Sequence, residues 1–294
     1  MAAAVRDFLE YLRVECGSAR NTALAYGRDL GALEAFLAGR RRAVETARGT
    51  DLADFLIAEH KRGLAAASLA RRMAAIRMLY RFLVSEGRVA RDPAGILERP
   101  HLGRRLPTVL TPGEVERLLA APEGDAPLAV RDRAALELLY AAGARASELA
   151  ALPVGAVNLS IGYARLLGKG GKERIVPVGG PALRAIERYL AEARPLLAGA
   201  SAPDALFLSR GGRALTRDAV WRLVARAAKK AGLTKRVYPH ALRHAFATHL
   251  VTGGAHLRAV QEMLGHADVS TTEVYTHLDI RHLREVYDKY HPRA

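Results

Sequence analysis

Apolar side chains recur at helical spacing through the first hundred residues. The pattern predicts helices over residues 1–16, 19–39, 50–62 and 66–86, and a glycine follows the first, third and fourth of them, as is typical of helix ends. We therefore expect the first part of the chain to be all helical.

The fourth of these segments carries an apolar stripe and, away from the stripe, basic residues. Because residues three and four apart share a face of a helix, the stripe should face a core. The basic side chains then form either an ordinary solvated face or a phosphate contact, and this segment alone favours the solvated face. The stripe consists of Leu69, Met73, Ile76, Tyr80 and Leu83, and the basic residues are Arg71, Arg77 and Arg81.

Residues 99–110 interrupt the helical pattern. They contain two prolines, one glycine and several basic side chains, a composition typical of an exposed linker between domains. Directly after them, Thr111 stands where a helix cap is expected, with proline at the next position and Glu114 three residues on. The sequence thus predicts one domain over residues 1–98 and a second over residues 111–294.

The second region is helical apart from one stretch with a β pattern. Short strands are predicted at 157–159, 163–167 and 173–178, and the glycine-rich residues 168–172 are typical of a hairpin turn. The expected fold class is therefore mainly α with a small antiparallel β-sheet.

The chain is strongly basic. Lys and Arg number 45 against 30 Asp and Glu, which gives a formal net charge of +15 and a pI near 10.4. Residues 1–100 hold 17 basic and 12 acidic side chains, and the remainder holds 28 and 18. Such a charge reflects either a general overuse of arginine or a polyanionic partner, of which nucleic acid is the first candidate. Because both domains are basic, the distribution fits a clamp around a duplex better than one docking patch.

The single cysteine and the lack of long apolar stretches bear on location. With Cys16 alone, neither an intramolecular disulfide nor a cysteine metal cluster can form. The first residues lack the apolar core of a signal peptide, and no stretch approaches the roughly 18 apolar residues that span a bilayer. We expect a soluble cytoplasmic protein.

Four segments of the second region hold side chains suited to phosphodiester cleavage without a metal. That reaction needs a nucleophile, a base, cations that hold the non-bridging oxygens, and an acid for the leaving oxygen. Arginine suits those oxygens because its planar fork matches their geometry. The candidates are Arg145 before a predicted helix, Lys169 in the hairpin turn, His240 and Arg243 on one helical face, and His266 and Tyr275 after a helix that Gly265 should end.

Each candidate also has an ordinary structural explanation. A lone arginine is usually a surface or ion-pair residue, and one tyrosine among ten usually belongs to a core. His240 and His244 stand four residues apart, as in a metal pair, but lack the intervening glutamate of a metalloprotease helix. His249 and His277 are expected to be packing or surface residues. For each candidate considered alone, the structural explanation is at least as good as a catalytic role.

Taken together, the segments resemble the tyrosine recombinases, the lambda-integrase-like family, and within it the Xer group. The order and spacing of the segments are the family's, and residues 1–98 also look like its core-binding domain, so that the resemblance covers nearly the whole chain. It implies an all-helical N-terminal core-binding (SAM-like) DNA-binding domain and an α+β catalytic domain with a C-terminal tail. The matching text is GARASEL at 143–149, LLGKGGKERIVPV at 166–178, PHALRHAFATHL at 239–250, LGHADVSTTEVYTH at 264–277 and HPRA at 291–294.

The resemblance also implies roles for the cationic candidates. Arg145 and Arg243 resemble the pair that clamps the scissile phosphate. Lys169 resembles the hairpin lysine that acts as general acid for the leaving 5′ oxygen. Gly171, where relatives often have asparagine, departs from the pattern but supplies no side-chain chemistry.

The remaining candidates complete the implied site. His240 resembles the family's acid/base histidine, and His266 resembles the histidine that hydrogen-bonds the phosphate. Tyr275 resembles the nucleophile that forms a 3′-phosphotyrosyl link. That link keeps the bond energy, so that the reaction is expected to need no metal, no ATP and no other cofactor.

Within the Xer group the chain looks closer to the XerD branch than to the XerC branch. The resemblance implies a DNA strand-transferring site-specific recombinase that resolves chromosome dimers at segregation and cell division. The implied partners are a double-stranded recombination site, a second Xer-type recombinase in a heterotetramer, and a DNA translocase as regulator, with no membrane. Residues 280–294 resemble a tail that docks in a neighbouring protomer, the alternative being a tail packed on its own domain.

Other functions remain open at the level of sequence. Within the family, the chain could be a XerC-like paralogue or another integrase. Outside recombination, it could be a non-catalytic DNA-binding protein on the same fold, a type IB topoisomerase, or a metal hydrolase built on its histidines.

Overall fold

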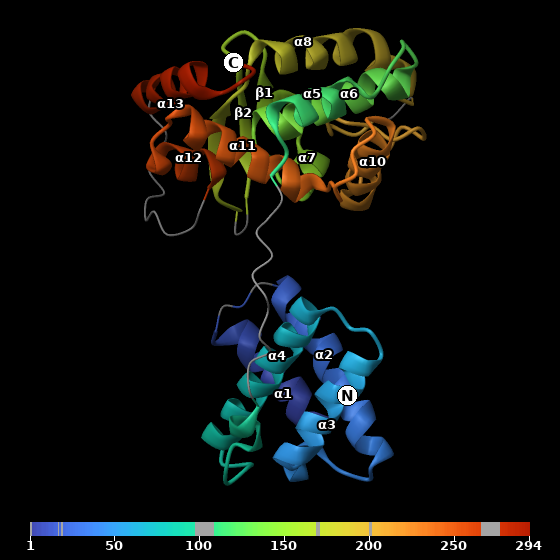
Figure 1. Cartoon of the computed structure of the whole chain (residues 1–294), viewed down its shortest axis with the longest axis vertical. Helices are drawn as coiled ribbons and strands as arrows, with labels where there is room; N and C mark the ends of the chain where they lie inside the picture. Colours follow the sequence, from blue (N-terminus) through green and yellow to red (C-terminus); the bar gives the residue numbers. More distant parts are fainter. Residues whose placement is uncertain are drawn as a thin grey trace. The chain divides into compact units, whose positions relative to one another are not determined.

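The described residues group into two compact units, which comprise Met1–Leu106 and Pro107–Ala294 (Figure 1). The computed structural model describes residues 2–16, 18, 20–97, 109–168, 171–199, 202–265 and 277–294. Most of the expected linker falls outside these ranges, so that its boundaries stay a prediction. None of the described helices is long and apolar enough to cross a membrane.

The first unit is all helical, as expected. Its helices are α1 (Ala3–Val14), α2 (Arg20–Gly39), α3 (Gly49–Lys61) and α4 (Ala66–Ser85), and short 3₁₀ turns lie at Val44–Thr46 and Pro93–Ile96. The apolar stripe predicted for α4 faces the core of this unit: its last four members are buried, and Leu69 packs against them. The buried hydroxyl of Tyr80 donates to the carbonyl of Val44 at 2.8 Å, which satisfies its polar group.

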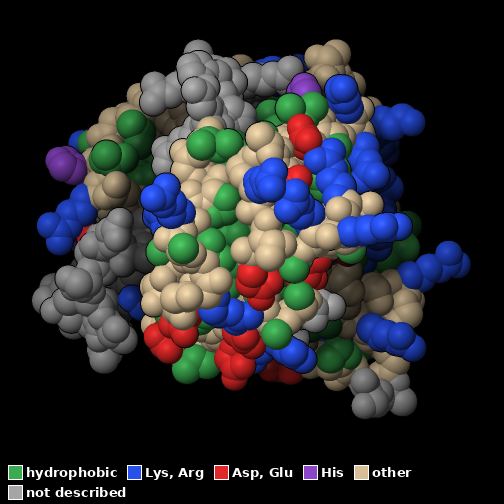
Figure 2. All heavy atoms as spheres, turned by 90° about the horizontal axis from the view of Figure 1, so that it is seen from below, with side chains coloured by type: hydrophobic (Ala, Val, Ile, Leu, Met, Phe, Trp, Pro, Cys, Tyr) green, Lys and Arg blue, Asp and Glu red, His purple; other side chains and the backbone are tan. Residues whose placement is uncertain are grey.

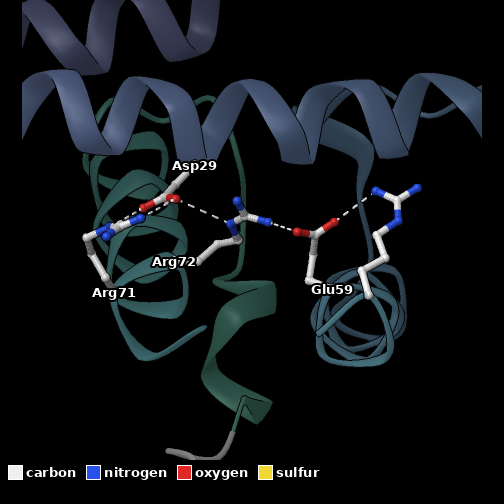
Figure 3. Close-up of polar contacts among 5 residues, drawn as sticks. Asp29, Glu59, Arg71 and Arg72 are labelled. Atoms are coloured by element: carbon white, nitrogen blue, oxygen red, sulfur yellow. Dashed lines mark hydrogen bonds and ion pairs between the residues drawn. The ribbon is translucent and has the colours of Figure 1, made fainter. Parts of the chain in front are cut away.

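A buried network of charges joins three helices of the first unit (Figure 3). Asp29 on α2 accepts hydrogen bonds from Arg71 at 2.8 and 3.1 Å and from Arg72 at 3.3 Å, and Arg72 also pairs with Glu59 on α3. The expectation of a simple solvated face on α4 therefore holds only in part. Arg71 is held by a carboxylate of another helix, and Arg77 donates to the backbone of the chain after α4, at the carbonyl of residue 97.

The second unit is built around helix α6 (Pro127–Ala141). Every residue from 134 to 142 is buried, because the helix is apolar on nearly all sides and other elements cover it. Around it lie α5 (Pro112–Ala120), α7 (Ala146–Ala151), α8 (Gly180–Arg188), α9 (Arg194–Leu197), α10 (Arg217–Lys230), α11 (Pro239–Gly253), α12 (Leu257–Leu264) and α13 (His277–Tyr290), with a π-helical turn at Tyr189–Ala193 (Figure 1). Thr111 caps α5 through a capping box with Glu114, as its sequence predicts.

One three-stranded antiparallel sheet interrupts these helices. Its strands β1 (Val157–Asn158), β2 (Tyr163–Leu167) and β3 (Glu173–Pro177) lie in chain order. The backbone amide of Gly168 donates to the carbonyl of Lys172 at 2.8 Å and closes the hairpin between β2 and β3. The fold class predicted from the sequence, mainly α with a small antiparallel sheet, is confirmed.

The C-terminal tail packs on its own unit. Helix α13 contacts β3, α11 and α12, and its Leu283 and Tyr287 are buried. Beyond the helix, Arg293 pairs with the buried Glu137 of α6 at 2.7 Å. Of the two tail arrangements that the sequence left open, the structure shows the one within a single chain.

Basic side chains are unevenly spread over the surface. In the face drawn in Figure 2, Lys and Arg gather toward the right and the upper part, whereas Asp and Glu gather near the lower edge.

Candidate functional site

Arg145 lies at the start of α7, just after a tight turn. The turn depends on Gly143, whose φ of +53° is in the left-handed region and whose missing Cβ would lie 2.6 Å from the ring of Phe246. Arg145 is the N-cap residue of α7, and its backbone N–H donates to Glu148 at 2.7 Å. Its guanidinium Nη1 donates to the other oxygen of the same carboxylate at 2.6 Å. Arg145 therefore lies at the N-terminus of α7, as the sequence predicts, and anions bind favourably at such a position.

Glu148 is shared between two arginines. Arg174 of β3 donates to it through Nη1 and Nη2, both at 2.8 Å, in the bidentate geometry that suits guanidinium and carboxylate. Burial by itself would raise the pKa of Glu148, but the hydrogen bonds and charges of Arg174 and Arg145 lower it to about 2. The carboxylate is therefore ionised throughout the neutral range.

Arg243 is buried on α11 and bonded to backbone rather than to carboxylates. Its Nη1 donates to the carbonyl of Gly143 at 2.6 Å, and its Nη2 donates to that of Leu264 at 2.5 Å. Burial, and then the positive charges of Arg145 and Arg174, lower its pKa to about 9. The group remains charged at neutral pH, and among the residues that the structure describes it uses two of the five N–H donors of a guanidinium.

His240 lies one helical turn before Arg243 and reaches solvent. Partial burial lowers its pKa, and the nearby charges of Arg243 and Arg145 lower it further. The imidazole is therefore neutral at physiological pH and can accept a proton.

The structure brings Arg145, His240 and Arg243 together from two separate segments of the chain. The end of the hairpin also lies here, since a Cβ on Gly168 would be 3.9 Å from Nη1 of Arg145. Three cationic or proton-accepting groups near the starts of α7 and α11 can bind and polarise a phosphate.

The other three candidates lie outside the described residues. They are Lys169, His266 and Tyr275, and no geometry is stated for them. Gly265, which precedes His266, ends α12 with a φ of +65°, as predicted from the sequence.

Two residues near this site received no role from the sequence. Glu148 could have been found, because a glutamate three residues after a helix cap is the pattern of a capping box. Arg174 carries no local signal, since its partners are 26 residues away on α7 and 89 residues away at the end of α12.

The histidine pair weighed for metal binding lies on the exposed side of α11. His240 and His244 both reach solvent. Within the described part of the chain, no group of three or more His, Cys, Asp or Glu side chains could hold a metal ion.

Family models match both units. Residues 108–282 match the phage integrase family, and residues 5–87 match the phage integrase N-terminal SAM-like domain. Tyrosine recombinase XerD of Halalkalibacterium halodurans is 44% identical over 293 residues, covering 99% of this chain and 98% of that protein. Tyrosine recombinase XerC of Xylella fastidiosa is also 44% identical, over 297 residues that cover 100% and 98%.

A solved structure of similar fold contains DNA. The recombinase XerH, bound to its palindromic difH substrate in a post-cleavage complex, is 25% identical, with a TM-score of 0.72, over 97% of this chain and 84% of that one.

Proposed function

The chain belongs to the tyrosine recombinases of the Xer group, and from this we propose that it cuts and rejoins DNA strands at a specific site through a covalent bond to Tyr275. The observation that carries the proposal is the convergence of Arg145, His240 and Arg243 in the second unit. We take the action to be XerD-like, the resolution of chromosome dimers at segregation.

The described residues supply phosphate binding and proton transfer. Arg145 and Arg243 hold the non-bridging oxygens of the scissile phosphate and stabilise the charge that builds on them. His240, whose pKa is lowered, exchanges a proton with the reacting oxygen.

The remaining candidates complete the proposed reaction. The hydroxyl oxygen of Tyr275 attacks phosphorus, its proton passes to a base, and the bond to the 5′ oxygen breaks. Lys169 gives that leaving oxygen a proton, and His266 hydrogen-bonds the phosphate. Attack by a 5′ hydroxyl on the phosphotyrosine reverses these steps and rejoins DNA without ATP.

The proposal extends to partners and location. The substrate is a double-stranded recombination site, occupied by this protein and a second Xer-type recombinase as a heterotetramer, with a DNA translocase as regulator. Action on the chromosome places the protein in the cytoplasm, which the single cysteine also favours.

The test is the covalent adduct. On a nicked chromosomal dimer-resolution site, from which the cleaved end diffuses away, the wild type should accumulate a protein–DNA adduct. Tyr275→Phe should give none, whereas Tyr163→Phe, which removes the same hydroxyl from β2, should behave as wild type. An adduct formed by Tyr275→Phe, or none by the wild type on any cognate site, would refute the assignment.

A second experiment separates binding from cleavage. Arg145→Ala should keep DNA affinity but lower adduct formation by about 100-fold or more, the usual cost of losing a preorganised charge. Arg165→Ala on β2 removes the same charge from an exposed position and is the matched control. Equal loss of affinity and cleavage would make Arg145 a simple affinity residue.

The same assays distinguish the rival functions. A non-catalytic DNA-binding protein would give no adduct, and a topoisomerase would relax supercoiled DNA without recombinant product. A metal hydrolase would lose activity in EDTA. With the XerC-like partner added, strand-specific labelling shows which recombinase cleaves which strand.

A further inference from the structure

Arg174 joins three elements around the candidate site. From β3 its guanidinium bonds Glu148 on α7 through both Nη atoms, and its Nε donates to the carbonyl of Met263 on α12 at 2.8 Å. The side chains of Arg174 and Glu148 are only 4% and 3% exposed. All three nitrogens of the guanidinium are thus used inside the protein.

Arg174 controls how strongly Glu148 acts on Arg145. A carboxylate paired with Arg145 alone would cancel its charge. Here the same oxygen, Oε1, accepts from Arg145 at 2.6 Å and from Arg174 at 2.8 Å, so that the three groups together keep one positive charge. The side chain of Arg145 is 32% exposed, so that this charge is accessible to an anion.

Arg174 also holds the last turn of α12. The unpaired carbonyls at a helix C-terminus attract cations. Arg174 bonds Met263, Arg243 bonds Leu264, and a Cβ on Gly265 would lie 2.8 Å from Cδ of Arg174. The point where the chain leaves α12 is therefore packed directly on Arg174, and His266 is the next residue in the sequence.

We propose that Arg174 is a positioning residue for strand cleavage. Through Glu148 it orients Arg145 without cancelling its charge, and through Met263 it fixes the end of α12 relative to that arginine. The inference rests on the proposed function, because it concerns the cleavage step.

The first test measures cleavage and affinity separately. Arg174→Met and Arg174→Lys are compared with wild type for the rate of adduct formation at saturating nicked DNA and for the apparent Kd. Arg174→Met should slow adduct formation by about 100-fold, and Arg174→Lys, which keeps the charge but loses the fork, by about 10-fold, with the Kd within threefold of wild type.

Arg131→Met is the matched control. Arg131 is a buried arginine of α6 that donates to the carbonyl of Leu208 at 2.6 Å and pairs with Asp132. Its loss should lower thermal stability but leave the rate at saturating DNA unchanged, once rates are corrected for the folded fraction.

A double variant tests the charge argument. Glu148→Gln retains a side chain able to form the capping box with Arg145 but removes the negative charge. If Arg174 acts by balancing Glu148, then adding Glu148→Gln to Arg174→Met should restore the rate at least about 10-fold over Arg174→Met. A purely structural role predicts a double variant no faster than the single one.

The outcomes separate this inference from the proposed function. If wild type forms the adduct and Tyr275→Phe does not, the function stands. A rate for Arg174→Met within twofold of wild type, or a double variant without recovery, then overturns the role of Arg174 alone. If Arg174→Met does not fold, Arg174→Lys decides by the same twofold limit. A wild type without adduct overturns both.

Discussion

His291 should make the second unit sensitive to acid. It is 5% exposed, and its ring stacks on Tyr287 with centroids 4.3 Å apart and lies 5.0 Å from that of Tyr140. Its Nδ1 accepts from the backbone of Arg293 at 3.1 Å, which leaves the ring proton on Nε2, an atom without a hydrogen-bond partner among the described residues. Burial, with smaller contributions from His249 and from the positive charge of Arg293, lowers the pKa of His291 to about 3.

The sign and size of the effect follow from that pKa. An unfolded histidine titrates near about 6.5, so that between roughly pH 6.5 and 3 the unfolded state binds a proton that the folded state rejects. His291 therefore does not lower the free energy of unfolding above about pH 6.5. Below that pH it lowers the free energy of unfolding by up to about 1.4 kcal/mol per pH unit. At pH 5 the loss from His291 amounts to about 2 kcal/mol.

His291→Phe should remove this loss while it keeps an aromatic ring in place. We expect its free energy of unfolding to lie within about 1 kcal/mol of wild type at pH 7.5, where a weak hydrogen bond is lost and an unpaired donor is removed. The difference in free energy of unfolding between the variant and wild type should shift by about 2 kcal/mol in favour of the variant when the pH is lowered from 7.5 to 5.

The assay uses a reporter that the sequence provides. Trp221 on α10 is the only tryptophan in the chain, so that its fluorescence during urea unfolding follows the second unit alone. Curves at pH 7.5, 6.5, 5.5 and 5.0 are compared for wild type, His291→Phe and His282→Phe. The last variant removes an exposed histidine from α13, the helix that ends just before His291. Parallel pH dependence of wild type and His291→Phe would refute the reasoning.

Three further predictions test the site and both units. The rate of adduct formation should stay constant as the pH falls to about 6.5 and drop only below it, because the pKa of His240 is lowered and its neutral form accepts the proton; a decline that begins above pH 7 would contradict this. Gly143→Ala should cost about 2 kcal/mol or more in urea unfolding followed by Trp fluorescence, since its Cβ meets Phe246 at 2.6 Å in a left-handed conformation. Asp29→Asn should destabilise the first unit by about 3 kcal/mol by circular dichroism, because Arg72 loses a buried partner, while the Trp transition stays unchanged.

Local periodicity was sufficient to predict the four helices of the first unit and the strands of the second. The helix expected over 66–86 is observed as Ala66–Ser85, and the strand expected over 163–167 has those bounds. Both follow from spacing within one segment, where 3.6-residue and two-residue repeats differ plainly. The turn glycines at 143 and 265 likewise act locally, through backbone conformations that other residues adopt at a cost.

Contacts between distant segments could not be predicted in this way. The periodicity of α4 shows that Arg71 points away from the apolar stripe of its helix. It does not show that Arg71 pairs with Asp29, which is 42 residues away in the sequence. Within its strand, Arg174 is one more alternating residue. Only the folded structure brings it to Glu148 of α7 and to the end of α12. For the candidate site, motif order supplied the residues, and Lys169, His266 and Tyr275 stay predictions.

Backbone carbonyls fix the arginine side chains of the site without neutralising them, so that the site is both ordered and positively charged. Arg243 bonds two backbone carbonyls, and Arg174 bonds one as well as Glu148. Carbonyl oxygens satisfy N–H donors and fix their direction but do not cancel the charge. The pKa of Arg243 is lowered first by burial and then by the positive charges of Arg145 and Arg174, which repel its guanidinium. If the proposed function holds, a phosphate of DNA bound between these arginines would relieve that repulsion, and DNA binding should therefore stabilise the second unit.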